Sequence, residues 1–193
     1  MSMRWKGGTK PNPPTLSSST ASGSWTLQAQ MQALAAGTWP VISPPGLYSW
    51  GWNAYGQLGL GNTTDLSSPK QVGALTTWSS ITAGWYHTVA IKTDGTLWSW
   101  GSNPYGQLGL GNTTYYSSPK QVGALTTWSK IAAGEYHTVA IKTDGTLWSW
   151  GYNAQGQLGL GNTTSYSSPK QVGALTTWSK ITAGFYHTVA LKS

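Results

Sequence analysis

The stretch HTVAIKTDGTLWSWG, residues His87–Gly101, recurs letter for letter at His137–Gly151. Its two runs, HTVAIK and TLWSWG, alternate apolar and polar residues, which is the pattern of a β-strand with one buried face. Thr-Asp-Gly separates the runs, and an Asp-Gly pair in that place favours a tight turn because glycine accepts a positive φ. The stretch therefore predicts two antiparallel strands joined as a hairpin.

The hairpin belongs to a unit that occurs three times, starting at Leu47, Leu97 and Leu147 with a period of fifty residues. Periods of about 20–50 residues are typical of solenoids, propellers and arrays. Elsewhere in the unit, NxxGQLGLGN is turn and loop sequence, SSPKQV begins an edge strand at its proline, and WSKIAAG gives one more short strand. Four short strands are the content of one propeller blade. We predict an all-β, propeller-type array of three four-stranded blades over 47–96, 97–146 and 147–193.

The unit resembles a known repeat. LWSWGSNPYGQLGLGN, followed by AGEYHTVAIKTDGTLWSWG, is similar to the regulator-of-chromosome-condensation repeat, and the resemblance covers 47–193. It implies a propeller that serves as a protein-interaction platform. The best-known member of that family is a nucleotide exchange factor for a small GTPase and binds chromatin. Its exchange activity depends on a wedge inserted in the propeller, and no unit here carries an insertion, so the resemblance does not imply exchange.

Three units are fewer than the roughly four to eight blades of a closed propeller. The segment YHTVALKS, which ends at Ser193, and the segment LYSWG, which begins at Leu47, correspond to the two halves of one hairpin. We therefore expect a head-to-tail homo-oligomer that pairs 47–50 of one copy with 186–192 of another. The alternative is that the gene carries a recently duplicated or truncated array.

Residues 1–46 form a second region with a different composition. Residues 1–23 are rich in Pro, Ser, Thr and Gly, which predicts a flexible arm. A short helix is expected at about 27–36, because Thr26 is a suitable N-cap and Gly37 and Pro40 are stop signals. A Pro-rich linker follows. The helix either packs on the propeller or anchors the chain to a larger assembly, with Trp25, Leu27, Met31, Leu34 and Trp39 as the anchoring side chains.

The segment ASGSWTLQAQMQALAAGTWP, residues 21–40, resembles a short segment found near the termini of tailed-phage structural proteins. This second resemblance implies a virion component, such as a capsid decoration, tail or fibre protein, attached to the virion through 1–40. The alternative is a cellular protein-interaction scaffold, associated with chromatin or a GTPase. The chain has no apolar run of membrane-spanning length and no signal peptide, so we expect it in the virion or else in the cytoplasm.

The net charge of +7 results from a shortage of acids, with eleven basic and four acidic residues. The lysines of the repeats recur singly and form no dense basic patch, so a nucleic-acid partner is not expected. The chain has no cysteine, which excludes disulfides and thiolate metal sites.

The ionisable residues do not predict an enzyme. Asp94 and Asp144 are turn residues, and the other acids, Asp65 and Glu135, occupy non-equivalent positions, so no carboxylate pair is placed for acid–base chemistry. The equivalent residues His87, His137 and His187 are expected to have a repeated structural role, because successive blades would hold them too far apart for one metal. We predict no catalytic residues, no metal and no cofactor.

The three copies differ drastically at a few positions, for example Trp85, Glu135 and Phe185. Such positions should be exposed, because an unpaired buried charge is costly, and exposed loops on a rigid scaffold are where binding sites are usually built. We predict that these loops bind a surface protein or glycan, and the alternative is neutral drift. The predicted binding residues are Trp52, Tyr55, Asp65, Leu66, Trp85, Tyr105, Tyr115, Tyr116, Glu135, Tyr152, Gln155, Tyr166 and Phe185.

Overall fold

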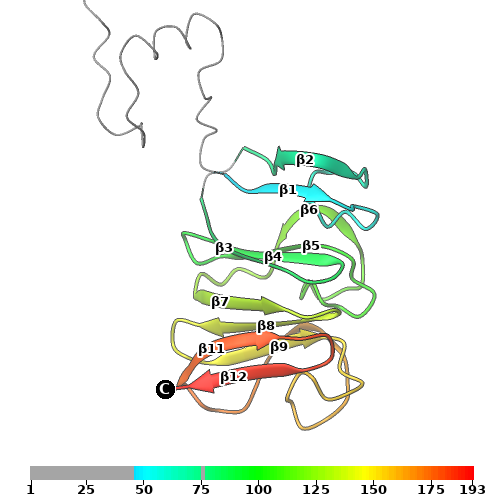
Figure 1. Ribbon diagram of the computed structural model, residues 1–193. Coiled ribbons are helices and arrows are strands. Elements are labelled where there is room, and N and C mark those ends of the chain that lie inside the picture. Colours follow the sequence, from blue (N-terminus) through cyan, green and yellow to red (C-terminus); the bar gives the residue numbers. More distant parts are fainter. Residues whose placement is uncertain (1–45, 75–76) are drawn as a thin grey trace, which may run out of the picture. The chain divides into compact units, whose positions relative to one another are not determined.

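The computed structural model describes residues 46–74 and 77–193, whose regular structure is entirely β-strand (Figure 1). The arm, the helix predicted at 27–36 and the anchoring residues predicted between Trp25 and Trp39 lie outside the described residues. The strands are β1 (Tyr48–Gly51), β2 (Leu66–Gln71), β3 (Trp78–Ala83), β4 (His87–Lys92), β5 (Leu97–Gly101), β6 (Tyr116–Gln121), β7 (Trp128–Ala133), β8 (His137–Lys142), β9 (Leu147–Gly151), β10 (Tyr166–Gln171), β11 (Trp178–Ala183) and β12 (Thr188–Lys192).

The strands form four antiparallel sheets. Two sheets have four strands, in the orders β3-β4-β5-β6 and β10-β9-β8-β7, and two sheets have two strands, β1-β2 and β11-β12. The prediction of an all-β propeller-type array is confirmed, and the described chain is a partial propeller. Sheets and sequence units are out of phase, because each four-stranded sheet takes two strands from one unit and two from the next. Strand β7 lies against both β3 and β11, so the first strands of successive sheets are neighbours.

The predicted hairpin is the centre of each complete sheet. Strands β4 and β5 pair with Thr88 opposite Trp100 and Ile91 opposite Leu97, and β8 and β9 pair in the equivalent register. In the turn, the Asp94 carboxylate accepts hydrogen bonds from the Thr96 hydroxyl at 2.6 Å and the Thr96 amide at 2.9 Å. These bonds lower the pKa of Asp94, so the aspartate of the Asp-Gly pair has a structural role in the turn.

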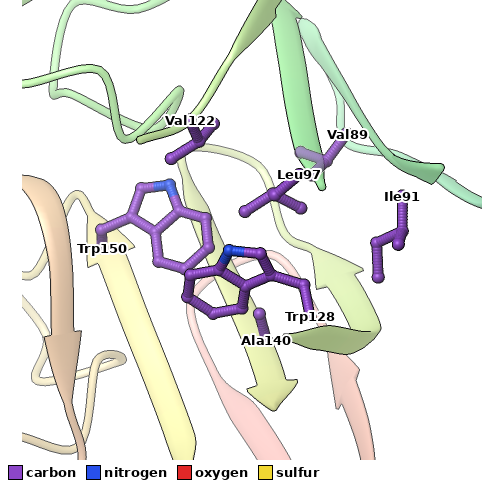
Figure 2. Close-up of a cluster of buried hydrophobic side chains, with 7 residues drawn as sticks. All are labelled: Val89, Ile91, Leu97, Val122, Trp128, Ala140 and Trp150. Carbon is purple, nitrogen blue, oxygen red and sulfur yellow. The ribbon is translucent and has the colours of Figure 1, made fainter. Parts of the chain in front are cut away.

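The hydrophobic core lies between successive sheets. Figure 2 shows one cluster in which Val89 and Leu97 of one complete sheet meet Trp128, Ala140 and Trp150 of the next. The centroids of Trp128 and Trp150 are 5.9 Å apart, and Trp150 is fully buried. Burial of large side chains from two sheets together stabilises the contact between blades rather than a single blade.

A hydrogen-bond ladder also joins each repeat to the next. The carbonyl oxygen of Gln107 accepts from Trp150 Nε1 at 2.9 Å and from the Thr138 hydroxyl at 2.8 Å. Gln57 receives the same two bonds from Trp100 and Thr88. The loop that carries Gln107 must come close to the indole, and a Cβ at Gly109 (φ +72°) would lie 2.7 Å from Trp150 Nε1, so only glycine fits there.

The ladder is incomplete at its third step. The carbonyl oxygen of Gln157 accepts from the Thr188 hydroxyl at 2.8 Å, and within the described part of the chain no indole N–H reaches it. Trp50, the counterpart of Trp100 and Trp150, is 58% exposed, whereas the other two are 1% and 0% exposed. In the described sheets, β1 and β12 each pair with one strand, whereas their counterparts β5 and β4 pair with two.

Among residues 46–74 and 77–193, no helix has the length and apolar character needed to cross a membrane.

Candidate functional site: an aromatic surface at the strand ends

Aromatic side chains from all three repeats form one connected group, which we call the aromatic surface. Neighbouring rings are in contact, mostly edge to face, with centroids 4.5–6.4 Å apart. Its members are Trp52, Tyr55, Trp85, Tyr86, Tyr105, Tyr115, Tyr136, Tyr152, Phe185 and Tyr186. Edge-to-face pairs add stability beyond their buried area, so this group is an ordered surface.

Two kinds of loop bring the rings together. The first kind is the turn after β3, β7 or β11, which in the first repeat carries Trp85 and Tyr86. Strand β7 lies against β3 and β11, so these turns are neighbours. The loop after β1, β5 or β9 supplies the other rings. This loop is held by a buried asparagine, since Asn103 donates to the carbonyls of Asn112 and Thr114 and accepts from the Leu108 amide. The rings therefore stand on a rigid frame.

Most of the predicted aromatic binding residues lie in this surface. Those that the structure brings together are Trp52, Tyr55, Trp85, Tyr105, Tyr115, Tyr152 and Phe185. Several of these side chains are exposed, as expected of binding residues; Trp85, for example, is 57% exposed. That they bind a partner stays a prediction.

Other predicted binding residues lie apart from these ring contacts. The Asp65 carboxylate accepts a hydrogen bond from the backbone N–H of Asn53 at 2.8 Å. In the third repeat Ser165 takes this role, and its hydroxyl oxygen accepts from the backbone N–H of Asn153 at 3.1 Å. Asp65 thus has a structural contact that the sequence comparison did not indicate. Leu66, Tyr116 and Tyr166 begin strands β2, β6 and β10 and are half-buried, and Gln155 lies in the loop after β9.

The expectation that Glu135 is exposed is wrong, because its side chain is only 4% exposed. Its counterparts Trp85 and Phe185 contact each other with centroids 4.5 Å apart, and its carboxylate contributes to the raised pKa of Tyr136 and of Tyr186. Neighbouring aromatic side chains therefore shield Glu135 from water. The prediction that it is exposed had rested on the presence of Trp and Phe at the equivalent positions of the other two repeats.

The comparison of copies also missed part of the surface. Tyr86, Tyr136 and Tyr186 are identical in all three repeats, so a search for variable positions could not select them. They nevertheless link the variable rings, since Tyr86 contacts both Trp52 and Trp85, and Tyr136 contacts Tyr105. The sequence did contain one signal for these tyrosines, because each directly follows the position that holds Trp85, Glu135 or Phe185.

The equivalent histidines show the contacts expected of a structural role. His87 Nε2 lies 3.0 Å from Thr138 Oγ1, and His137 Nε2 lies 3.0 Å from Thr188 Oγ1. Since each threonine hydroxyl donates to a glutamine carbonyl, each histidine must donate from Nε2. Burial lowers the pKa of His87 to about 3 and that of His137 to about 4, with the neighbouring histidine as a smaller cause. His187, in the last repeat, is exposed.

Across residues 46–74 and 77–193, no group of three or more His, Cys, Asp and Glu side chains is placed to hold a metal ion.

Comparison with known proteins identifies the repeat. Residues 46–91, 94–141 and 144–191 match the family described as Regulator of chromosome condensation (RCC1) repeat. The ultraviolet-B receptor UVR8 of Arabidopsis thaliana is 37% identical over 71 residues, which are 34% of this chain and 16% of UVR8.

Solved structures with the same fold are larger than the described chain. Prp20p from Saccharomyces cerevisiae is similar with a TM-score of 0.67 at 25% identity, covering 74% of this chain and 38% of Prp20p. Human WBSCR16 is similar in fold with a TM-score of 0.66 at 22% identity, covering 77% of this chain and 40% of that protein. The chain thus spans less than half of the proteins it matches.

Proposed function

Because the chain belongs to the family of RCC1 repeat proteins, we propose that it is a non-enzymatic scaffold that binds a partner protein through the aromatic surface. The observation that carries this proposal is the unbroken contact of aromatic rings across three repeats. Tyr and Trp offer large contact areas with few rotatable bonds, and they are enriched among the residues that dominate binding energy.

The relatives favour a cellular scaffold over a virion protein. Prp20p is described by its binding to Gsp1p and histones, and the relatives named above come from a plant, a yeast and human. The virion role was predicted from residues 21–40, which lie outside the described residues, and none of the comparisons supports it. Gsp1p and histones are defined first probes for this chain, because the shared fold makes partners of the same kind a reasonable starting point.

The binding proposal can be tested without knowing the natural partner. Peptides selected from a random library on the wild-type chain would be measured by fluorescence polarisation against the variant W52A/Y105A/Y152A. Removal of three contact rings should weaken binding by at least about tenfold. The matched control is L125A/L175A, because both leucines are 49% exposed and belong to the GALTT loops, outside the aromatic surface. If a glycan array instead gives binding that depends on the same rings while no peptide does, the partner is a carbohydrate.

We also propose that two copies of this chain pair head to tail, so that β1 of one copy continues the sheet beyond β12 of the other. The sequences of β12 and β1 correspond to those of β4 and β5, which pair in each complete sheet. Transferring that register places Thr188 opposite Trp50 of the second copy and Val189 opposite Ser49.

The incomplete third step of the ladder supports this pairing. A cavity of about 380 Å³ lies beside Gln157 and Gly159, at the place that Trp100 and Trp150 fill in the first two steps. The position facing Gly159 is open, since a Cβ there would meet only Val172 at 3.5 Å. Trp50 of a second copy would supply the missing indole N–H to the carbonyl of Gln157 and would bury a ring that is otherwise mostly exposed.

Light scattering and disulfide trapping test the pairing. A dimer should have twice the 20.5 kDa mass of one chain, and both W50A and G159A should restore the mass of one chain, whereas W52A should not. The chain has no cysteine of its own, so S49C/V189C should cross-link between copies on mild oxidation while either single variant should not form that bond. A wild-type mass of 20.5 kDa at every concentration contradicts the pairing.

A further inference from the structure

Three equivalent positions in the repeats carry side chains of different chemistry that meet in space. Trp85, Glu135 and Phe185 follow strands β3, β7 and β11 at the same place in the repeat. Strand β7 lies against β3 and β11, so the turn with Glu135 lies between the other two turns. The rings of Trp85 and Phe185 nevertheless contact each other at a centroid distance of 4.5 Å, with an interplanar angle of 88°. Glu135 thus lies on the middle one of three turns whose outer two carry aromatic rings that meet each other.

The carboxylate of Glu135 is incompletely satisfied. Its Oε2 atom is buried and has no hydrogen-bond partner among the described residues. The carboxylate is close enough to Tyr136 and Tyr186 to contribute to the raised pKa of both phenols. A buried carboxylate oxygen without a donor is costly, and the remaining acids in the described repeats, Asp65, Asp94 and Asp144, are exposed. Glu135 is therefore the acid whose environment a ligand could improve.

The two tyrosines leave the site with one negative charge. Burial, and to a smaller extent the Glu135 carboxylate, raise the pKa of Tyr136 to about 12. Burial and the same carboxylate also raise the pKa of Tyr186, and burial is again the larger cause. Both phenols therefore stay neutral and act as donors at neutral pH. The charge that a ligand would meet is that of the single carboxylate.

We propose that Trp85, Glu135 and Phe185 form a binding site for an alkylammonium group, which Glu135 pairs by charge and the two rings contact by their faces. Ring faces attract cations, and tryptophan does so most strongly. The chain already uses this contact elsewhere, since Lys92 Nζ lies 3.5 Å from the centroid of the Trp98 ring. Trp85 and Phe185 are 57% and 37% exposed, so a ligand can reach both rings from the solvent.

The free oxygen favours an ammonium over a guanidinium. A guanidinium binds a carboxylate best as a fork that uses both oxygens, whereas an ammonium acts as a point charge that one oxygen can pair. Oε2 of Glu135 is buried and has no hydrogen-bond donor among the described residues, and an ammonium needs only this one oxygen. The inference rests on the proposed function, because it assigns the chemistry of one group that the aromatic surface would recognise in a partner: a lysine side chain or a small alkylated amine.

The test uses choline and its neutral isostere 3,3-dimethylbutan-1-ol, which have the same shape and differ in charge. Nuclear magnetic resonance titration of the full chain at constant ionic strength would follow the Trp85 indole and Phe185 ring signals, assigned with W85F and F185L. We expect choline to bind at least about tenfold more tightly than the alcohol, and E135Q to remove that difference. Choline binding that is no tighter than alcohol binding, or that is unchanged in E135Q, overturns the site.

A second pair of probes identifies the source of the ammonium. A short peptide with one lysine and the same peptide with norleucine would be titrated alongside choline; preference for lysine indicates a protein partner, and preference for choline alone indicates a small amine. E135F, which copies Phe185, is the second variant in case E135Q alters the fold, and it should lose the charge preference as well.

The outcomes also separate this site from the proposed function. If the selected peptides lose affinity in W52A/Y105A/Y152A but choline binding does not depend on Glu135, the scaffold proposal stands and the ammonium site fails. If choline binding depends on Glu135 while no protein or peptide requires the aromatic surface, the site stands and the scaffold proposal fails.

Discussion

His87 and Thr138, which are 51 residues apart in sequence, meet at 3.0 Å between Nε2 and Oγ1 and so connect two repeats. The Thr138 hydroxyl in turn donates a hydrogen bond to the carbonyl oxygen of Gln107. We predict that Thr138→Val destabilises the chain more than Thr88→Val, because only the former also leaves a buried histidine N–H without an acceptor. The extra loss of unfolding free energy should be about 1–3 kcal/mol in urea titrations. Equal losses in the two variants would show that the histidine bond contributes nothing.

The buried histidines predict that stability falls with acid. The folded-state pKa values of His87 and His137, about 3 and 4, lie below the ordinary 6.5, so below pH 6.5 the unfolded chain takes up protons that the folded chain does not. The unfolding free energy should therefore decrease between about pH 6 and pH 4.5, by up to about 2.7 kcal/mol per pH unit for two histidines. The variant H137Q should reduce that slope by about half, and a slope that H137Q leaves unchanged would count against this assignment.

Two equivalent glycines should respond differently to alanine. Gly109 and Gly159 have φ of +72° and +67°, so both variants share the cost of a left-handed backbone, but only at Gly109 does the new Cβ lie 2.7 Å from an indole nitrogen. We expect Gly109→Ala to cost at least about 1 kcal/mol more unfolding free energy than Gly159→Ala, measured in urea at a concentration where the chain is monomeric. Equal losses of unfolding free energy would mean that Trp150 can move away from the new Cβ without any loss of stability.

Asp65 should prove to be a structural residue. Because Ser165 makes the equivalent contact in the third repeat, Asp65→Ser should be nearly neutral, while Asp65→Ala should cost about 1 kcal/mol. Neither variant should change the affinity of a selected peptide. A loss of peptide affinity in D65S at full stability would return Asp65 to the binding residues predicted from sequence.

The strand content and hairpin register could be predicted from the sequence, because alternation along HTVAIK and TLWSWG and an Asp-Gly turn act over a few residues. The sequence did not show that each four-stranded sheet combines two strands of one unit with two of the next, since this depends on which strands of neighbouring units pair. Which strands of neighbouring repeats join into one blade is therefore determined by tertiary structure, even though each strand is evident from the sequence.

The site was predictable only in part for a similar reason. Variation between copies selected Trp52, Trp85 and Phe185, whose exposure leaves them free to differ. It could not select Tyr86 or Tyr136, which do not differ, and it misplaced Glu135. The burial of Glu135 depends on the aromatic rings contributed by the two flanking repeats, and no property of a single repeat contains that information.

The most direct test of the scaffold proposal is the dissociation constant of one selected peptide for three forms of the chain: wild type, W52A/Y105A/Y152A and L125A/L175A. The proposal predicts that the aromatic variant binds at least about tenfold more weakly, while the leucine variant binds like the wild type and all three forms unfold at similar urea concentrations. Equal affinity of the aromatic variant and the wild type would contradict it.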